Sequence, residues 1–237
     1  MAYSNSPLIS GKVDFGAKKS NPRKSKTYNP SGKISKITVH HMAGKMDPVD
    51  CAKMHLNGTR SASANYYIGN DGKIILGVPE ERRAWTSSSP ANDYLAVTIE
   101  VANSINSEFW PVSDAAYKSL IELCTDICVR NGIEKLNFTG DKNGNLTMHK
   151  YFAKTACPGP YLEERFPDIA RKVNDNLSAG QIVVSPEPSA KYYIVKKGDT
   201  LSKIGVMHGI RLAKIKELNP DIKDMNKIYI GQKVRIK

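Results

Sequence analysis

Histidine and cysteine are the residue types in this 237-residue chain whose spacing could bind a transition metal. His40 and His41 follow a β-branched run at residues 36–39, and His149 precedes Cys157 by eight residues. A loop of that length can bring an imidazole and a thiolate to one ion. Two histidines, one cysteine and an open fourth position are typical of a three-ligand catalytic zinc site. From spacing alone, two unrelated histidines and a buried thiol remain the alternative.

The adjacent histidines are not equivalent. Neighbouring residues of an extended strand point to opposite faces, so only one of His40 and His41 can bind the same ion. Cys124 and Cys128 follow the spacing of a buried helical stripe and are interpreted as core residues. A cysteine protease would also combine histidine with cysteine, but as base and nucleophile, and it is the weaker hypothesis.

The elements that must position these residues alternate between strands and helices. Apolar, β-prone runs at 36–40 and 94–101 predict strands, and turn residues 69–72 between two apolar runs predict a hairpin. Cap and glycine signals predict helices over about 47–58 and 113–132. This order indicates an α/β fold whose central sheet is mostly buried.

Composition divides the chain into four parts. Residues 1–33 are basic, poor in apolar side chains, and predict an N-terminal arm. Residues 34–175 hold the α/β pattern, and residues 176–190 contain a Ser-Pro-Glu-Pro-Ser linker. Residues 191–237 have the order strand, helix, helix, strand, which predicts a small βααβ domain.

The charge and composition exclude several classes of protein. The chain carries 35 Lys and Arg against 23 Asp and Glu, and the excess lies at the two ends, in residues 1–36 and 191–237. Basic ends favour a polyanionic partner or serve solubility alone. The lack of a basic stripe interleaved with aromatics argues against nucleic acid. No apolar run reaches the roughly 18 residues of a membrane span, and four cysteines do not form a disulfide framework.

Several short motifs recur in an order that resembles a known family. The motifs are Ile37-Thr38-Val39-His40-His41-Met42-Ala43, Ala64-Asn65-Tyr66-Tyr67-Ile68 before Asp71-Gly72, Val97-Thr98-Ile99-Glu100-Val101-Ala102-Asn103, and His149 with Thr155-Ala156-Cys157-Pro158-Gly159. Together they resemble the zinc-dependent N-acetylmuramoyl-L-alanine amidases, a family that includes many phage endolysins and is similar to the peptidoglycan recognition proteins. The resemblance covers about residues 34–173. It implies a central mixed sheet with flanking helices and a zinc cleft on one face.

The resemblance assigns roles to individual residues. It implies that Zn²⁺ is bound by His40, His149 and Cys157, and it selects His40 because the first ligand of the family directly follows the apolar strand residues.

It also implies three catalytic residues. Glu100 matches the acidic residue of the central strand, and Tyr66 matches a tyrosine beside the metal. Thr155 occupies the position where many phage members have lysine and the recognition proteins often have threonine. The oxyanion donor is therefore Tyr66 or Thr155. Trp85 either lines the cleft or packs in the core.

The last 47 residues resemble a second family. The motifs are Tyr193-Ile194-Val195, Gly198-Asp199-Thr200-Leu201, Ile204, Leu218-Asn219-Pro220 and Ile230-Gly231-Gln232-Lys233-Val234. Together they resemble LysM modules, which bind the N-acetylglucosamine units of peptidoglycan or chitin between two loops. The resemblance implies that the glycan-binding residues are Gly198, Asp199, Thr200, Leu201, Asn219, Pro220 and Ile222.

These resemblances imply a peptidoglycan hydrolase. It would cleave the amide between N-acetylmuramic acid and L-alanine with water activated by zinc and Glu100, while LysM holds it on the wall. The basic ends would add attraction to teichoic acids. The alternative is a peptidoglycan-binding protein without catalytic activity. The N-terminus has no basic region followed by an apolar core, so we expect a cytoplasmic protein without a signal peptide that acts on the wall after release.

Overall fold

The computed structural model divides the chain into two compact units, Met1–Ser185 and Pro186–Lys237. It describes residues 3–180, 192–208, 210–219, 222, 224–225 and 227–236. Most of the predicted linker at 176–190 lies outside the described residues, although helix α5 continues to Ser178 and includes its first residues. Within the described part of the chain, the helices are too short or too polar to cross a membrane.

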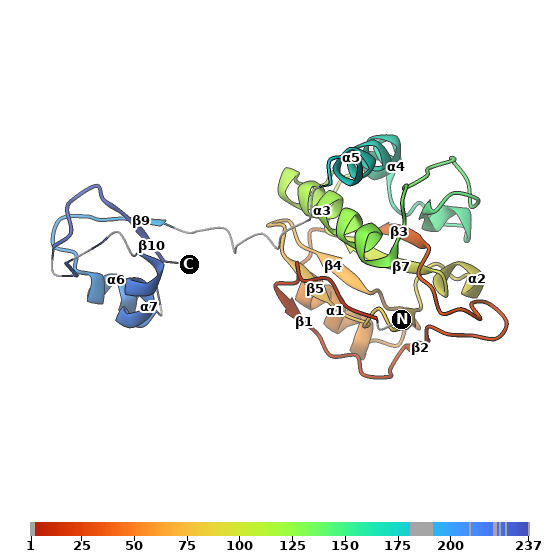
Figure 1. Cartoon of the computed structure of the whole chain (residues 1–237), viewed down its shortest axis with the longest axis horizontal. Helices are drawn as coiled ribbons and strands as arrows, with labels where there is room; N and C mark the ends of the chain where they lie inside the picture. The colour runs from red at the N-terminus through yellow and green to blue at the C-terminus, as the bar shows by residue number, and fades with distance from the viewer. Residues whose placement is uncertain are drawn as a thin grey trace. The chain divides into compact units, whose positions relative to one another are not determined.

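The first unit contains a six-stranded mixed sheet with the strand order β1-β5-β4-β7-β3-β8 (Figure 1). Its strands are parallel except for the antiparallel β4–β5 hairpin. Two further strands, β2 and β6, form a separate antiparallel pair. The strands of this unit are β1 Gly11–Lys12, β2 Ser20–Pro22, β3 Lys36–His41, β4 Tyr66–Ile68, β5 Ile74–Leu76, β6 Arg82–Ala84, β7 Ala96–Val101 and β8 Leu146–Met148.

The helices of the first unit begin and end at the residues that favour such ends. The Asp47 side chain accepts from the backbone N–H of Val49 at the start of α1. Ser113 caps α3 in the same way, and Gly132 ends it with a φ of 66°. The helices are α1 Pro48–Asn57, α2 Pro90–Asp93, α3 Asp114–Asn131, the short 3₁₀ turn η1 His149–Tyr151, α4 Pro160–Glu163 and α5 Phe166–Ser178.

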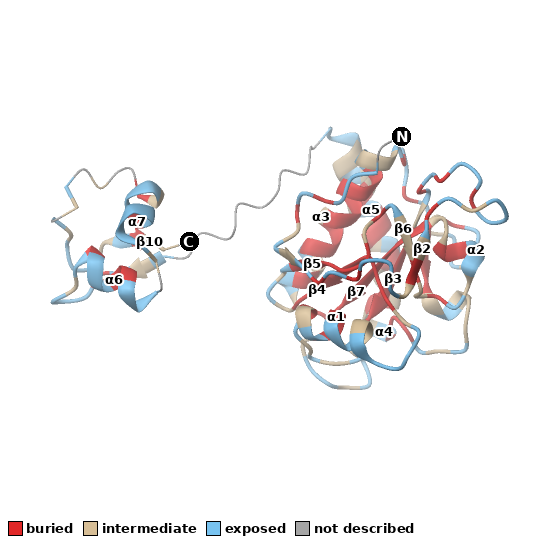
Figure 2. Cartoon of the chain, turned by 90° about the horizontal axis from the view of Figure 1, so that it is seen from below, coloured by how far each residue is buried: buried red, intermediate tan, exposed pale blue. Residues whose placement is uncertain are grey.

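The sheet separates two apolar cores (Figure 2). Helices α3 and α5 cover one face, where they pack on Val39, Tyr66 and Ile99. Helix α1 covers part of the other face, where Cys51 packs near Tyr67. Side chains alternate along each strand, so Tyr66 and Tyr67 of β4 belong to different cores. In β3 and β7 the residues between the apolar ones are buried polar side chains, such as His40 and Glu100. The strands are therefore buried on both faces, as the near-continuous apolar runs predicted.

The N-terminal arm belongs to the first unit and does not form a separate body. Strand β1 extends the main sheet beside β5, and β2 pairs with β6. Leu8 and Phe15 are buried in the two cores. The guanidinium of Arg23 is fully buried and donates to the backbone carbonyls of residues 80, 82, 93 and 96. The arm is thus fixed by strand pairing, apolar contacts and one buried charge.

The second unit is the predicted βααβ domain. Its strands pair in antiparallel orientation, and its own small core includes Leu201, Ile204, Ile215 and Val234. The side-chain hydroxyl of Thr200 caps the first helix. The elements are β9 Tyr192–Ile194, α6 Leu201–Met207, α7 Leu212–Leu218 and β10 Lys233–Arg235.

Candidate metal centre

Two adjacent parallel strands position the first residues of the site. His40 in β3 lies directly opposite Glu100 in β7 in the strand register. Both side chains point to the face of the sheet that carries α1, because Val39 and Ile99 beside them face the other core. Both are also largely buried, with 1% of His40 and 8% of Glu100 exposed.

The remaining residues come from the segment that follows β8. This strand pairs in parallel with β3 and ends at Met148, so His149 emerges at the same end of the sheet as His40. The chain then turns back, and the backbone N–H of Lys150 donates to the carbonyl of Cys157 over 3.1 Å. This turn brings the thiol next to the two imidazoles, as the eight-residue spacing predicted.

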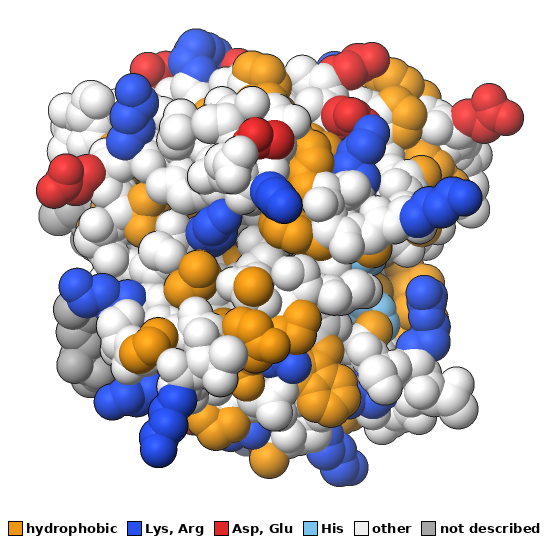
Figure 3. Space-filling model, turned by 90° about the vertical axis from the view of Figure 1, so that its right-hand side faces the viewer, with side chains coloured by type: hydrophobic (Ala, Val, Ile, Leu, Met, Phe, Trp, Pro, Cys, Tyr) orange, Lys and Arg blue, Asp and Glu red, His pale blue; other side chains and the backbone are white. Residues whose placement is uncertain are grey.

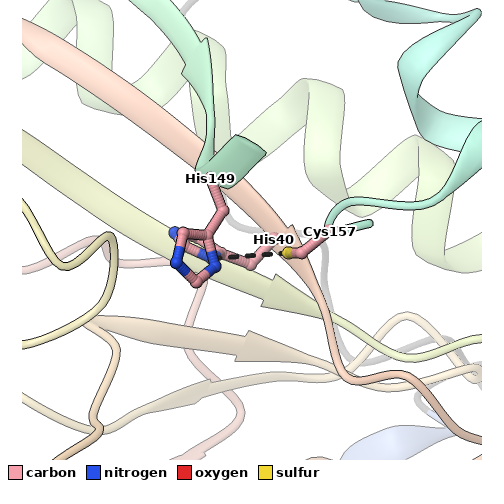
Figure 4. A group of neighbouring side chains, drawn as sticks. All are labelled: His40, His149 and Cys157. Atoms are coloured by element: carbon pink, nitrogen blue, oxygen red, sulfur yellow. Dashed lines mark hydrogen bonds between the residues drawn. The ribbon is translucent and has the colours of Figure 1, made fainter. Parts of the chain in front are cut away.

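His40, His149 and Cys157 form one compact group (Figure 4). One potential ligand atom from each residue lies within 4.8 Å of the others. The Cys157 sulfur is 3.5 Å from His40 Nδ1, and the ring centroids of His40 and His149 are 4.8 Å apart. The Nε2 atoms of both histidines are buried and have no hydrogen-bond partner among the described residues. Unpartnered buried nitrogens beside a thiol fit a metal ion that accepts nitrogen and sulfur ligands.

The electrostatics of the group favour the ligand forms of the histidines. Burial, followed by the neighbouring His149, lowers the pKa of His40 well below its ordinary value. Burial and the charge of Arg60 lower the pKa of His149. Both imidazoles are therefore neutral at pH 7, which is the form that binds metals. Burial raises the pKa of the Cys157 thiol, so the ion itself must favour the thiolate.

Glu100 is the acidic group nearest to this cluster in the strand register. Burial raises the pKa of its carboxyl from 4.5 to about 8, and Arg60 acts in the opposite direction. Its Oε2 atom is buried and has no hydrogen-bond partner among the described residues. A carboxyl group with a pKa near neutrality can both accept and donate a proton at physiological pH.

The group lies in a cleft of about 640 Å³. Polar and aromatic residues beyond the metal cluster line it, including Trp85, Arg83, Asp93, Arg60 and His55. Trp85 thus lines the cleft, which was one of its two expected positions. Figure 3 shows histidine surface on one face of the molecule with Lys and Arg side chains around it.

The structure separates the two predicted oxyanion donors. Thr155 lines the cleft, and its Oγ1 accepts from the backbone N–H of Cys157 over 3.2 Å. Tyr66 is fully buried on the opposite face of the sheet, where its hydroxyl donates to Glu80 Oε1 over 2.5 Å and accepts from the Ser6 amide. The prediction that Tyr66 lies beside the metal is therefore wrong. Strand alternation directs the side chain of Tyr66 away from the face that holds Glu100.

Three further residues near the site were not identified as functional from the sequence. Tyr67 is opposite Glu100 in the register, and its hydroxyl lies 3.0 Å from His55 Nδ1. His55 and Arg60 line the cleft. The alternation of the adjacent tyrosines signals that Tyr67 and Tyr66 face opposite sides, but sequence alone does not reveal that β4 lies beside β7.

His41 does not join the metal group. It is not among the residues whose ligand atoms converge, and its ring packs edge-on against Trp110 with centroids 5.4 Å apart. Burial lowers the pKa of His41 to about 4. The structure therefore places His40, and not His41, in the group with His149 and Cys157.

The predicted glycan-binding residues of the small unit differ from one another in burial and in hydrogen bonding. Gly198 has a φ of 86°, and the Asp199 carboxylate accepts from the Tyr193 hydroxyl and the Lys196 amide. Leu201 belongs to the core, and the side chain of Asn219 bonds to Ile215 and Arg235.

The side chains of Leu201 and Asn219 thus hold the two loops in place and do not face outward. Thr200 caps α6, and Ile222 is partly buried against the core. Pro220 lies outside the described residues.

Comparison with known families identifies both parts of the chain. Residues 30–160 match the family model described as N-acetylmuramoyl-L-alanine amidase, which is more than half of the chain. The chain belongs to this amidase family. Residues 193–237 match the model of the LysM domain. The family model includes all three residues of the metal group and Glu100, but it begins after most of the N-terminal arm.

Two amidases of Bacillus subtilis are similar to this chain over most of its length. The chain is 27% identical over 205 residues to the N-acetylmuramoyl-L-alanine amidase XlyB of Bacillus subtilis, covering 84% of this chain and 61% of XlyB. It is 22% identical over 200 residues to XlyA of the same organism, covering 83% of this chain and 59% of XlyA. The chain thus spans about three-fifths of the length of these relatives.

Solved structures of the family have the same fold. The amidase LysC of Clostridium intestinale matches with a TM-score of 0.51 and 22% identity, over 69% of this chain and 97% of LysC. The endolysin amidase LysCS of the same organism matches with a TM-score of 0.50 and 23% identity, over 70% of this chain and 97% of LysCS. The mixed sheet with flanking helices is therefore the amidase fold, as the sequence predicted.

Proposed function

We propose that the chain is a zinc-dependent peptidoglycan amidase that hydrolyses the bond between N-acetylmuramic acid and L-alanine. The observation that carries this proposal is the convergence of His40, His149 and Cys157 beside Glu100 in a cleft of an amidase-family chain. Peptidoglycan is the substrate class named by the family. The alternative of a binding protein without activity has no support in the site, because its metal-binding group and its acid are both intact.

The three ligands would hold a zinc ion, which supplies Lewis acidity to the amide carbonyl when it is bound. His40 and His149 are neutral, each has an unpartnered buried Nε2 atom, and Nδ1 of His40 lies 3.5 Å from the Cys157 sulfur. Cys157 is fixed by backbone bonds from both directions, through its N–H to Thr155 and through its carbonyl to Lys150. These contacts hold the ligand set in place before substrate binds, so little reorganisation accompanies the reaction.

Glu100 would act as the general base and then as the general acid. Its carboxylate accepts a proton from the attacking water and donates it to the leaving amine of L-alanine. Its raised pKa suits both steps, since the group loses and regains one proton near neutral pH. Substitution of such a group removes proton transfer while leaving the metal ligands in place.

Thr155 is the remaining oxyanion donor of the two predicted. Its Oγ1 accepts from the Cys157 amide, and this leaves the hydroxyl hydrogen to donate into the cleft that Thr155 lines. A donor aimed at the developing oxyanion contributes about 3–4 kcal/mol to such reactions. The small unit would bind glycan strands and so raise the local concentration of substrate.

Metal analysis combined with product analysis tests this function. The purified protein should contain about one zinc per chain, and a chelator should abolish the release of new L-alanine amino groups from cell walls. Glu100→Gln should keep zinc but reduce turnover by roughly 10²–10⁴-fold. Glu134→Gln provides a matched control, because Glu134 is exposed just after α3 and outside the cleft.

The products distinguish this amidase from other hydrolases. New reducing sugar ends without new amino groups would show cleavage of the glycan instead. Binding of walls by a zinc-loaded protein that releases no amine would support the non-catalytic alternative.

A further inference from the structure

The N-terminal arm lies behind one wall of the cleft. Strand β2 lies beside β6 (Figure 2). The register of this pair places Asn21 opposite Arg83. Arg83 and Trp85 line the cleft, whereas no residue of the arm does so among those described. The match to the amidase family model begins at residue 30, so this segment lies outside the matched residues.

One side-chain oxygen of the arm holds both wall residues. Asn21 Oδ1 accepts from the indole Nε1–H of Trp85 over 2.7 Å and from Nε–H of Arg83 over 3.0 Å. The guanidinium of Arg83 also lies 4.8 Å from the centre of the Tyr94 ring. These contacts fix the orientation of an aromatic ring and a cation that both face the cleft.

A second contact from the arm supports the neighbouring part of the cleft. The Lys19 ammonium donates to the carbonyls of His55, Gly58 and Arg60, at the C-terminal end of α1. A cation is favourable there because the last carbonyls of a helix lack intrahelical partners. His55 and Arg60 both line the cleft.

The same part of the arm is also joined to the wall through Ser63. The hydroxyl of Ser63 donates to the Lys19 carbonyl over 2.6 Å. The same hydroxyl oxygen, Ser63 Oγ, accepts from the backbone N–H of Trp85 over 2.9 Å. The backbone of Trp85 is thus connected to the arm independently of its indole ring.

We propose that Asn21 is a positioning residue of the substrate cleft, which orients Trp85 and Arg83 to bind the substrate, with Lys19 supporting the adjacent rim. This inference rests on the proposed amidase function. Asn21 does not touch the metal group or Glu100, so its contribution belongs to substrate binding and not to the chemical step. The arm then adds to the contacts that Asp93, Tyr94 and Ser63 already make with these two wall residues.

Steady-state kinetics on a soluble muramoyl-peptide test the proposal. Asn21→Ala should raise KM roughly tenfold and change kcat less than about twofold, because misplaced wall groups weaken binding. Zinc content should remain at the wild-type level. Asn21→Asp keeps an acceptor oxygen for both donors, so it should restore KM to near the wild-type value.

Asn29→Ala is the matched control for general destabilisation. Asn29 is a buried asparagine of the same arm, and its side chain donates to the carbonyls of Lys33 and Tyr94. None of these residues lines the cleft. Asn29→Ala should lower the melting temperature at least as much as Asn21→Ala while leaving KM unchanged. Equal increases in KM for both variants, or an unchanged KM for Asn21→Ala, would overturn the proposal.

A spectroscopic measurement separates this proposal from the proposed function. The indole Nε1–H resonance of Trp85, assigned by its loss in Trp85→Phe, should shift in Asn21→Ala and not in Asn29→Ala. If the wild type releases no amine, the amidase function fails, but the resonance still reports whether Asn21 holds Trp85. If the resonance does not move, the positioning role fails whatever the activity.

Discussion

Adjacent residues with similar side chains have different roles in this protein because strands alternate their faces. Tyr66 and Tyr67 are both fully buried, but Tyr66 bonds to Glu80 on one face while Tyr67 pairs with His55 on the other. His40 and His41 separate in the same way. The sequence predicts that neighbours diverge. The resemblance chose the member of the histidine pair that joins the group, but it chose the wrong tyrosine, which only the structure shows.

Tyr66→Phe tests the structural role that the geometry gives this tyrosine. The change removes one donor from the buried Glu80 carboxylate and the acceptor of the Ser6 amide. We expect it to reduce the free energy of unfolding by about 1–3 kcal/mol. Zinc content and turnover per folded molecule should not change. Urea denaturation measures the stability, and the amine-release assay measures the turnover. A large loss of turnover with unchanged stability would instead show that Tyr66 takes part in catalysis.

The raised pKa of Glu100 predicts how the stability of the metal-free protein depends on pH. Folding raises this pKa from 4.5 to about 8, so folding favours the protonated form. The stabilisation is complete below pH 4.5 and is lost as pH rises through 8. A shift of this size sets an upper limit of about 5 kcal/mol, since each pKa unit corresponds to about 1.4 kcal/mol.

Glu100→Gln should remove this dependence because its amide does not titrate. We therefore expect chelator-treated Glu100→Gln to be more stable than chelator-treated wild type at pH 9, and the difference to shrink at pH 5. Urea unfolding at both pH values provides the measurement. A stability difference that is equal at pH 5 and pH 9 would contradict the raised pKa.

At the level of elements, the sequence predicted α1 and α3 because their ends carry strong local signals, and it predicted β3, β7 and the β4–β5 hairpin. It did not predict β8 or α5. Asp47, Ser113 and Gly132 fix helix ends through contacts within a few residues. The position of the arm could not be predicted in this way. Its strand β2 pairs with β6 some 60 residues later, and neither strand has the apolar alternation that marks a buried strand.

The same distinction applies to the site. The three residues of the metal group could be predicted to lie together because histidine and cysteine are rare and their order resembles a known family. Asn21 and Lys19 could not, because polar residues in a basic, glycine-containing segment resemble a solvated arm. Their role depends on contacts with residues 36 or more positions away.

Arg23 is the strongest single attachment of the arm. Burial lowers the pKa of its guanidinium only to about 10, so it remains charged at neutral pH among backbone carbonyls. Arg23→Lys keeps the charge, but an ammonium cannot reach carbonyls on both β6 and β7. We expect a loss of about 2–4 kcal/mol in the free energy of unfolding. Lys24→Ala, at an exposed neighbour, should change it by less than about 0.5 kcal/mol. Equal effects of the two changes in urea denaturation would show that the buried contacts contribute nothing.

At the scale of the whole molecule, the chain combines a unit that contains the cleft with a separate LysM unit. Each unit has its own apolar core, and the residues of the metal group all belong to the first unit. The basic excess of the chain is concentrated in the arm and in the small unit. Catalysis and wall binding are therefore expected to respond to different changes.

Truncation after Gly180 tests this separation. The shortened chain keeps both cores of the first unit, so its kcat/KM on a soluble muramoyl-peptide should equal that of the full chain. Its lysis of intact walls should fall by roughly 10²-fold or more, because the second binding site that holds the enzyme on the polymer is lost. Ile204→Asp in the full chain, which places a charge in the core of the small unit, should reproduce the defect without shortening the chain. Equal loss of activity on soluble and insoluble substrates would instead show that the first unit depends on the second for its folding or its chemistry.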